Sequence, residues 1–227
     1  MNYFVTGTDT GVGKTLVSCA LLHGFAAQGK RVVGMKPVAA GCDDDGQNED
    51  VLQLRAAGNV AVGYGQINPY CFVPAIAPHL AAQRAGVIIR ISRIATSYRE
   101  LAAQADVVIV EGAGGLLVPL NEQQDSADLA KELGLPVILV AGMRLGCLNH
   151  ALLTQESIAA RGLVLAGWVA NVLDAEMPAL QQNIDTLQQR IAAPLLGIVP
   201  HLPRPDARDA AGRLDLDRLY NNGVHPD

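Results

Sequence analysis

The chain has 227 residues, of which 50% are hydrophobic and 17% are charged, and its formal net charge at pH 7 is −5. This length suffices for a large core, and we expect a single P-loop domain over residues 1–227. The acidic balance lacks the basic footprint of nucleic-acid-binding proteins, so we expect no nucleic-acid partner. Residues 135–143, the longest apolar stretch, are too short to span a bilayer, so we expect no membrane partner.

The cysteines and the first residues bear on the compartment. Cys19, Cys42, Cys71 and Cys147 include no C-x-x-C pair, so zinc binding and a disulfide are only weakly supported. The first residues run straight into a predicted strand, so a signal peptide does not fit there. Together these features predict a soluble protein in the reducing cytoplasm.

Short, β-branched apolar runs predict strands whose two faces are both buried, because the runs do not alternate with polar residues. In chain order they cover residues 3–6, 31–35, 107–110, 137–141, 164–171 and 195–199. Helical patterns cover residues 14–28, 91–103, 127–133, 151–160 and 179–191. Strand–helix alternation predicts an α/β fold with a doubly wound, mostly parallel sheet flanked by helices. Residues 41–104 are less regular, and the polar tail, residues 204–227, is expected to be poorly ordered.

A glycine-rich loop, Gly7 to Thr15, joins the first predicted strand to the first predicted helix. Strand, glycine loop, Gly-Lys-Thr and helix is the context of a phosphate-binding P-loop, although Gly7 stands one residue earlier than the usual spacing requires. Glycines let backbone N–H groups curl around phosphate oxygens, and the helix N-terminus adds the positive end of its dipole. Lys14 can reach the β- and γ-phosphates, and the Thr15 hydroxyl can bind Mg²⁺. The alternative is an ordinary βα turn with a fortuitous Lys-Thr.

The loop therefore predicts that the protein binds a nucleoside triphosphate. We expect the nucleotide to contact Thr10, Gly11, Val12, Gly13, Lys14 and Thr15.

Ligands of an open α/β sheet bind outside the carboxyl ends of the strands, so the polar residues there are candidates. Lys36 follows the second predicted strand and would face the γ-phosphate or a second anion. Glu111 ends the third predicted strand and suits a Mg²⁺ ligand, and Asp50 can supply a second carboxylate. The alternatives are that Lys36 only snorkels from the sheet end, that Glu111 is a turn carboxylate and that Asp50 is an acid at a helix start.

Two further strand ends suit ligand recognition. Asn171 and the segment Pro200, His201, Leu202 and Pro203 can recognise and sandwich a nucleotide base, although asparagine is also a common turn former.

Residues 144–150 lead from the fourth predicted strand into a helix, whose first N–H groups can hold a carboxylate. Cys147 is interpreted as a small packing residue rather than a nucleophile, because no partner base is evident. His150 is interpreted as structural.

Taken together, several motifs closely resemble the dethiobiotin synthetase family over roughly nine-tenths of the chain. They are the P-loop with its five-residue spacing, Lys36-Pro37-Val38, Asn68-Pro69-Tyr70, Pro78-His79, Glu111-Gly112-Ala113-Gly114-Gly115, Leu145-Gly146-Cys147 with Asn149-His150-Ala151, and Gly167-Trp168-Val169-Ala170-Asn171. The resemblance implies a cyclo-ligase of biotin biosynthesis. In this reaction 7,8-diaminopelargonic acid and CO₂ (from bicarbonate) give a carbamate, ATP phosphorylates it, and the second amine closes the cyclic urea.

The resemblance also implies residue roles. Lys14 and Lys36 are the catalytic cations, and Mg²⁺ is held by Thr15, Asp50 and Glu111. The substrate contacts are implied at Thr10, Lys36, Ala40, Gly146, Cys147 and Asn149. The contact of the 146–149 segment with the substrate carboxylate crosses subunits in the family, which implies a homodimer.

Two positions depart from the family pattern. Ala40 stands where a hydroxyl residue is common, and Gly11 stands where glutamate is frequent. Both bear on affinity rather than reaction class, and the choice between ATP and CTP stays open.

The alternative from another class is a regulatory ATPase of the partitioning or division-site type. Such proteins carry a second lysine at the position of Asp9 and tend to end in a basic amphipathic helix, unlike this tail. A related amidotransferase-type synthetase would need a glutaminase domain, for which the chain has no room.

Overall fold

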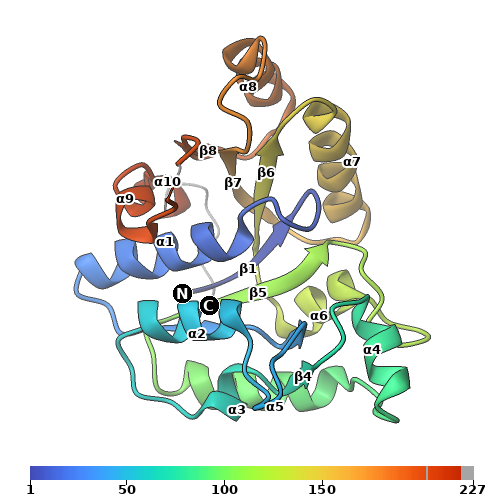
Figure 1. Cartoon of the computed structure of the whole chain (residues 1–227). Coiled ribbons are helices and arrows are strands. Elements are labelled where there is room, and N and C mark those ends of the chain that lie inside the picture. Colours follow the sequence, from blue (N-terminus) through green and yellow to red (C-terminus); the bar gives the residue numbers. More distant parts are fainter. Residues whose placement is uncertain (203, 221–227) are drawn as a thin grey trace.

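The computed structural model describes residues 1–202 and 204–220, and within them a six-stranded sheet forms the centre of the molecule (Figure 1). All neighbouring strands pair in parallel, in the order β2-β5-β1-β6-β7-β8. The strands are β1 (Asn2–Gly7), β2 (Val32–Met35), β5 (Val107–Gly115), β6 (Val137–Met143), β7 (Leu165–Val172) and β8 (Leu195–Val199). Their central residues are almost all buried, as the continuous apolar runs predict.

Helices cover both faces of this sheet. One face packs against α1, α2, α9 and α10, and the other packs against α4 to α8. The helices are α1 (Lys14–Ala27), α2 (Glu49–Ala57), α3 (Tyr64–Ile67), α4 (Pro78–Arg84), α5 (Ile91–Ala102), α6 (Ser126–Leu133), α7 (Cys147–Ala160), α8 (Leu180–Arg190), α9 (Ala207–Ala211) and α10 (Asp217–Tyr220). The predicted doubly wound α/β fold is thus confirmed. Within the described residues, no helix is long and apolar enough to cross a bilayer.

The strand β5 extends further than the sequence predicts. Its apolar run ends at Val110, but Glu111 still pairs with Val5 of β1 and, after a shift in register, Gly115 pairs with Gly7. The run Gly112 to Gly115 suggests a turn, whereas here the small residues let β5 lie close beside the start of the P-loop. Glu111 is therefore fixed within a strand.

The irregular middle of the sequence contains a second, two-stranded parallel sheet, made of β3 (Val38–Ala40) and β4 (Tyr70–Phe72). Strands of three residues and helices as short as α3 leave no periodic signal, so the sequence analysis missed them. This small sheet begins two residues after Lys36 and leads into the loop before α2.

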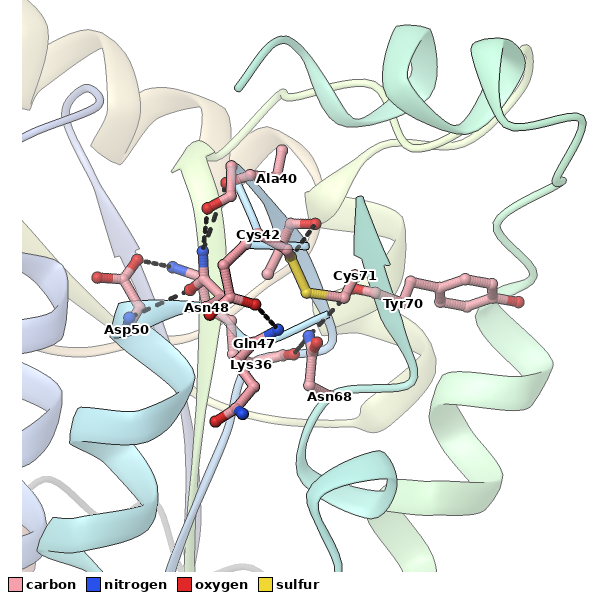
Figure 2. The surroundings of a disulfide bond; sticks show 12 residues. Lys36, Ala40, Cys42, Gln47, Asn48, Asp50, Asn68, Tyr70 and Cys71 are labelled. Carbon is pink, nitrogen blue, oxygen red and sulfur yellow. Dashed lines mark hydrogen bonds and ion pairs between the residues drawn. A yellow bond between two sulfur atoms is a disulfide. The ribbon is translucent and has the colours of Figure 1, made fainter. Parts of the chain in front are cut away.

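A disulfide joins Cys42 to Cys71, so the argument from cysteine spacing against a disulfide is wrong (Figure 2). The two cysteines are 29 positions apart in sequence, but the pairing of β3 with β4 brings their Cα atoms to 6.2 Å. Spacing rules detect local pairs, whereas this pair is created by the fold. Cys19 and Cys147, both in the described part of the chain, remain free and buried.

Within residues 204–220, the polar tail forms the short helices α9 and α10. Ala210 and Leu219 are 0% and 1% exposed and join the apolar cluster around α1, and Leu216 packs there too. Composition does not predict this packing, because the few apolar residues of the segment stand among many polar ones. Residues 221–227, which the same expectation covers, lie outside the described residues.

We predict that Leu219→Ala lowers the free energy of unfolding by about 2–5 kcal/mol, because it leaves a cavity in the apolar cluster that α1 and β7 share. Denaturant unfolding measures this change. The matched control is Leu52→Ala, since Leu52 is 40% exposed and its truncation should cost far less. Equal effects of the two substitutions would contradict the packing of the tail.

Candidate active site

The P-loop connects β1 to α1 through residues that need left-handed backbone angles. Gly11 has φ 74° and Gly13 has φ 89°, a region that favours glycine. Thr8 anchors the loop to β6, since its N–H donates to the Val140 carbonyl over 3.0 Å and its hydroxyl accepts from Gly142 N–H over 3.3 Å. Among the described residues, no side chain caps the start of α1 and no acid stands in its first turn. Its first N–H groups can therefore receive an anion.

Asn171, at the carboxyl end of β7, supports the loop from behind. Its Nδ2 donates to the Val12 carbonyl over 2.8 Å, and a Cβ on Gly13 would lie 2.2 Å from that Nδ2. Val12 itself is buried in the core, so its carbonyl is a firm anchor. The sequence predicts that Asn171 contacts the nucleotide base. The contact seen here is with the P-loop, and the base contact stays a prediction.

Lys14 is 6% exposed, and its ammonium forms no ion pair with another described residue. Its Nζ donates to the Asp9 carbonyl over 3.0 Å. Burial, and after it the charge of Lys36, lowers the pKa of Lys14 to about 8, against the opposing effect of Glu111 and Asp50. A bound phosphate would supply the missing negative charge.

Lys36 lies between two carboxylates. Its Nζ is 2.5 Å from Glu111 Oε1 and 3.0 Å from Asp50 Oδ2. Burial by itself would lower the pKa of Lys36, but Glu111 and Asp50 outweigh it and the pKa is raised. Burial likewise opposes ionisation of Asp50, yet Lys36 holds its pKa below the usual value. Lys36 is thus a fixed cation at the carboxyl edge of the sheet.

The oxygen atoms around Lys36 fit a Mg²⁺ ion. The Thr15 hydroxyl donates to Glu111 Oε1 over 2.9 Å, which brings together the three predicted metal ligands, Thr15, Asp50 and Glu111. Glu111 is fully buried, and its Oε2 has no hydrogen-bond partner among the described residues. The described residues hold no group of three or more His, Cys, Asp or Glu suited to a metal. Two carboxylates and a hydroxyl instead suit Mg²⁺, which keeps waters and takes substrate phosphates as further ligands.

Two buried asparagines that the sequence analysis did not assign position these groups. Asn68 Nδ2 donates to the Lys36 carbonyl over 2.6 Å and to the Tyr70 carbonyl over 3.0 Å (Figure 2). Asn48 is the N-cap of α2, since its Oδ1 accepts from Asp50 N–H over 3.1 Å. Asn48 at a helix start followed by acids is a recognisable cap signal. Nothing in the local sequence around Asn68 reveals its partners.

A cleft of about 1200 Å³ collects most of the predicted site residues. Its walls include Thr10, Gly11, Gly13, Lys14, Thr15, Lys36, Ala40, Asp50 and Glu111. The remaining predicted residues are not among those that line it: Val12, Gly146, Cys147, Asn149, Asn171, Pro200, His201 and Leu202. Pro203 lies outside the described residues.

The start of α7 presents a second surface. Gly146, with φ 92°, is its N-cap; Gly146 and Asn149 are exposed, and the preceding Leu145 is 98% exposed. Cys147 is buried in an apolar cluster, as the packing interpretation predicts. In this chain the segment does not line the cleft, so its contact with substrate stays a prediction that needs a second subunit.

The P-loop follows a strand of a parallel sheet and ends in Lys14 and Thr15, and the neighbouring strand β5 supplies the acid Glu111. This arrangement defines a P-loop nucleotide-binding protein. The family model described as an AAA domain matches residues 1–208. Two solved structures share the fold at low identity: the MinC:MinD cell division complex and MinD from Aquifex aeolicus. Their TM-scores are 0.58 and 0.55 at 15% and 13% identity, and both cover 100% of this chain and 98% of their own. At such identity they show the fold alone.

Curated relatives identify the family. ATP-dependent dethiobiotin synthetase BioD from Nitrosospira multiformis is 58% identical over 217 residues, which are 96% of each chain. The protein of the same name from Aromatoleum aromaticum is 54% identical over 94% of this chain and 96% of its own. The chain therefore belongs to the dethiobiotin synthetase family.

We predict that Asn171→Asp weakens binding of inorganic tripolyphosphate about tenfold, because the variant loses the donor to Val12 and sets a carboxylate beside the loop. Titration calorimetry with tripolyphosphate and with ATP measures this. Asn59→Asp is the control, since Asn59 makes similar amide bonds far from the loop. If only ATP binding weakens, Asn171 reads the base and does not support the loop.

Proposed function

We propose that this chain converts 7,8-diaminopelargonic acid and CO₂ to dethiobiotin with ATP, as a cyclo-ligase of biotin biosynthesis. The observation that carries this proposal is similarity to proteins named ATP-dependent dethiobiotin synthetase over 96% of the chain. The cleft that holds Lys14, Lys36, Asp50 and Glu111 supports it. A regulatory ATPase of the division-site type is not favoured, because Asp9 stands where its second lysine would be.

The proposed reaction has three steps. One substrate amine attacks CO₂ and loses a proton, which gives a carbamate. A carbamate oxygen then attacks the γ-phosphorus of ATP, and ADP leaves. The second amine finally attacks the carbamate carbon, expels phosphate and closes the urea ring.

The cations of the cleft stabilise the negative charge of the second step. Lys14 contacts the β- and γ-phosphates and the carbamate. Lys36, held at the cleft by Asn68 and its carboxylate partners, contacts the carbamate and the transferring phosphoryl group. Thr15, Asp50 and Glu111 hold Mg²⁺, which when bound neutralises charge on the phosphate oxygens.

Substrate contacts complete the proposed site. Thr10 orients the diamine beside the loop, and Ala40 lines the cleft without the hydroxyl common in the family, so that contact is lost or bridged by water. The exposed segment Gly146 to Asn149 binds the distal carboxylate of a substrate in the partner's cleft, which makes the enzyme a homodimer. The enzyme acts in the cytoplasm, with no nucleic-acid or membrane partner.

We predict that phosphate release from ATP depends on diaminopelargonic acid, bicarbonate and Mg²⁺ together, and that Lys14→Ala abolishes it. The fold should survive, because Lys14 makes no ion pair with another described residue. A phosphate-release assay with a panel of nucleotides measures turnover and settles the choice of ATP or CTP. Lys30→Ala, on an exposed position, is the control. Activity of Lys14→Ala within a few-fold of wild type would contradict the P-loop assignment.

We predict that Lys36→Arg lowers kcat about 10²–10³-fold, the effect of losing one contact to developing charge. A planar guanidinium cannot replace a compact ammonium between Glu111 and Asp50 and also reach a carbamate oxygen. Steady-state kinetics with saturating ATP check this. Near-normal turnover would mean that Lys36 only neutralises the carboxylates.

We predict that a mixture of Lys14→Ala and Asn149→Trp chains regains activity although each parent is inactive. The heterodimer pairs an intact P-loop with an intact 146–149 segment in one of its two sites. The control mixes Lys14→Ala with Lys36→Ala, whose defects fall in the same cleft, and should show no recovery. No recovery in the first mixture, with subunit exchange demonstrated, would mean that each chain holds a complete site.

A further inference from the structure

The segment from Ala40 to Asp50, here called the carboxylate arm, carries Asp50 to its place beside Lys36. Asp43 N–H donates to the Gln47 carbonyl over 2.8 Å, and Gln47 N–H donates to Asp43 Oδ1 over 2.6 Å. The bonds from Asn48 Nδ2 back to Ala40 and Gly41 are longer, at 3.5 and 3.4 Å. Beyond β3, the arm makes two shorter hydrogen bonds to neighbouring elements: Cys42 N–H donates to the Phe72 carbonyl over 3.0 Å, and Asn48 N–H donates to the Tyr64 hydroxyl over 2.8 Å.

β4, by contrast, is fastened to the body of the protein. Asn68 links the start of β4 to the Lys36 carbonyl. The Tyr70 hydroxyl accepts from Arg90 N–H over 3.0 Å, and the Arg93 guanidinium lies 4.8 Å from the Tyr70 ring. The Cys42–Cys71 disulfide ties the arm covalently to this anchor (Figure 2). An isolated pair of three-residue strands has little stability of its own, so the covalent link matters here.

The disulfide also lies in the small apolar cluster next to the metal ligand. Cys42 packs there with Ala39, Val51 and Ile67, with Cys71 at its edge. Val51 is fully buried and directly follows Asp50 in α2. Two thiol sulfurs cannot stay at bonding distance, because unbonded heavy atoms meet at about 3.5–4.0 Å. Reduction must therefore push apart the cluster on which the first turn of α2 rests.

We propose that Cys42 and Cys71 are a redox-responsive clasp, whose oxidised form positions Asp50 and whose reduction weakens the binding of Mg²⁺·nucleotide. The role of Asp50 rests on the proposed function. The P-loop lies on β1 and α1, outside the arm, so its hold on the phosphates is unaffected. The effect falls on the Mg²⁺-dependent part of nucleotide affinity.

The chemistry is thiol–disulfide exchange. Cys71 is partly exposed whereas Cys42 is 6% exposed, so a low-molecular-weight thiolate attacks the Cys71 sulfur and the Cys42 thiolate leaves. A second thiolate attacks the outer sulfur of the mixed disulfide and releases the Cys71 thiolate. Overall, the two external thiols are oxidised to one disulfide. Their two electrons and two protons reduce the Cys42–Cys71 bond to two cysteine thiols. A low-molecular-weight disulfide reverses the reaction.

The test is titration calorimetry of the wild-type protein, oxidised with glutathione disulfide or reduced with dithiothreitol, using ATP with Mg²⁺ and ATP with EDTA. Peptide mass mapping verifies the 42–71 bond in the oxidised sample. Reduction should raise the Kd for ATP with Mg²⁺ five-fold or more, the low end of coupling between sites. It should leave the Kd without Mg²⁺ unchanged, and reoxidation should restore the original value.

Matched variants separate the clasp from general thiol effects. Cys42→Ser and Cys71→Ser should each match the reduced wild type and ignore the redox state, whereas Cys19→Ala, at a free thiol, should keep the redox response. The clasp is overturned if the bond does not form in glutathione disulfide. It is also overturned if both redox states bind ATP with Mg²⁺ equally, or if the affinities with and without Mg²⁺ change together. These readouts need no diaminopelargonic acid, so an absence of ring-closing activity would contradict the proposed function alone.

Discussion

The buried ammonium of Lys36, held between Glu111 and Asp50, is the interaction on which the rest of the site depends. Removing one partner of a buried ion pair such as Lys36–Glu111 typically costs about 3–5 kcal/mol, since it leaves an uncompensated charge. Lys36 directly follows β2, Glu111 lies in β5 and Asp50 lies in α2. The two ion pairs can therefore form only if β2 lies beside β5 and α2 packs against both α1 and the sheet. The fold and the site are therefore specified by the same contacts.

The ion pairs of Lys36 also explain why the two lysines of the cleft differ. The pKa of Lys14 is lowered because Lys14 is buried and because Lys36 lies nearby. In the proposed function, a bound phosphate supplies the opposite charge. Lys36 is already paired with Glu111 and Asp50, which raise its pKa against the effect of burial and keep it charged. Asn171, Asn68 and Asn48 each fix the backbone that carries one of these groups rather than facing the cleft as charges. Positioning in this site is thus done largely by neutral amides.

The sequence predicts much of this arrangement because its strongest signals are local. Apolar runs define the strands, and the glycines with Lys14 and Thr15 define the P-loop. The Cys42–Cys71 bond, the β3–β4 pairing and the packing of Leu216 on α1 are contacts between distant segments, which no local pattern encodes. Asn171 shows the same limit, since an amide at a strand end serves a base or a carbonyl equally well, and only its neighbours decide.

In the proposed reaction, the γ-phosphoryl group of ATP is transferred to a carbamate oxygen beside Lys14 and Lys36. Mass spectrometry of the phosphate released during turnover of diaminopelargonic acid with ¹⁸O-labelled bicarbonate tests this directly. The phosphate is collected early, before the bicarbonate and CO₂ lose their label by exchange with water. Because a carbamate oxygen attacks the γ-phosphorus and leaves with it at ring closure, each phosphate should carry one ¹⁸O atom. Phosphate without label, formed while dethiobiotin accumulates, would contradict the account.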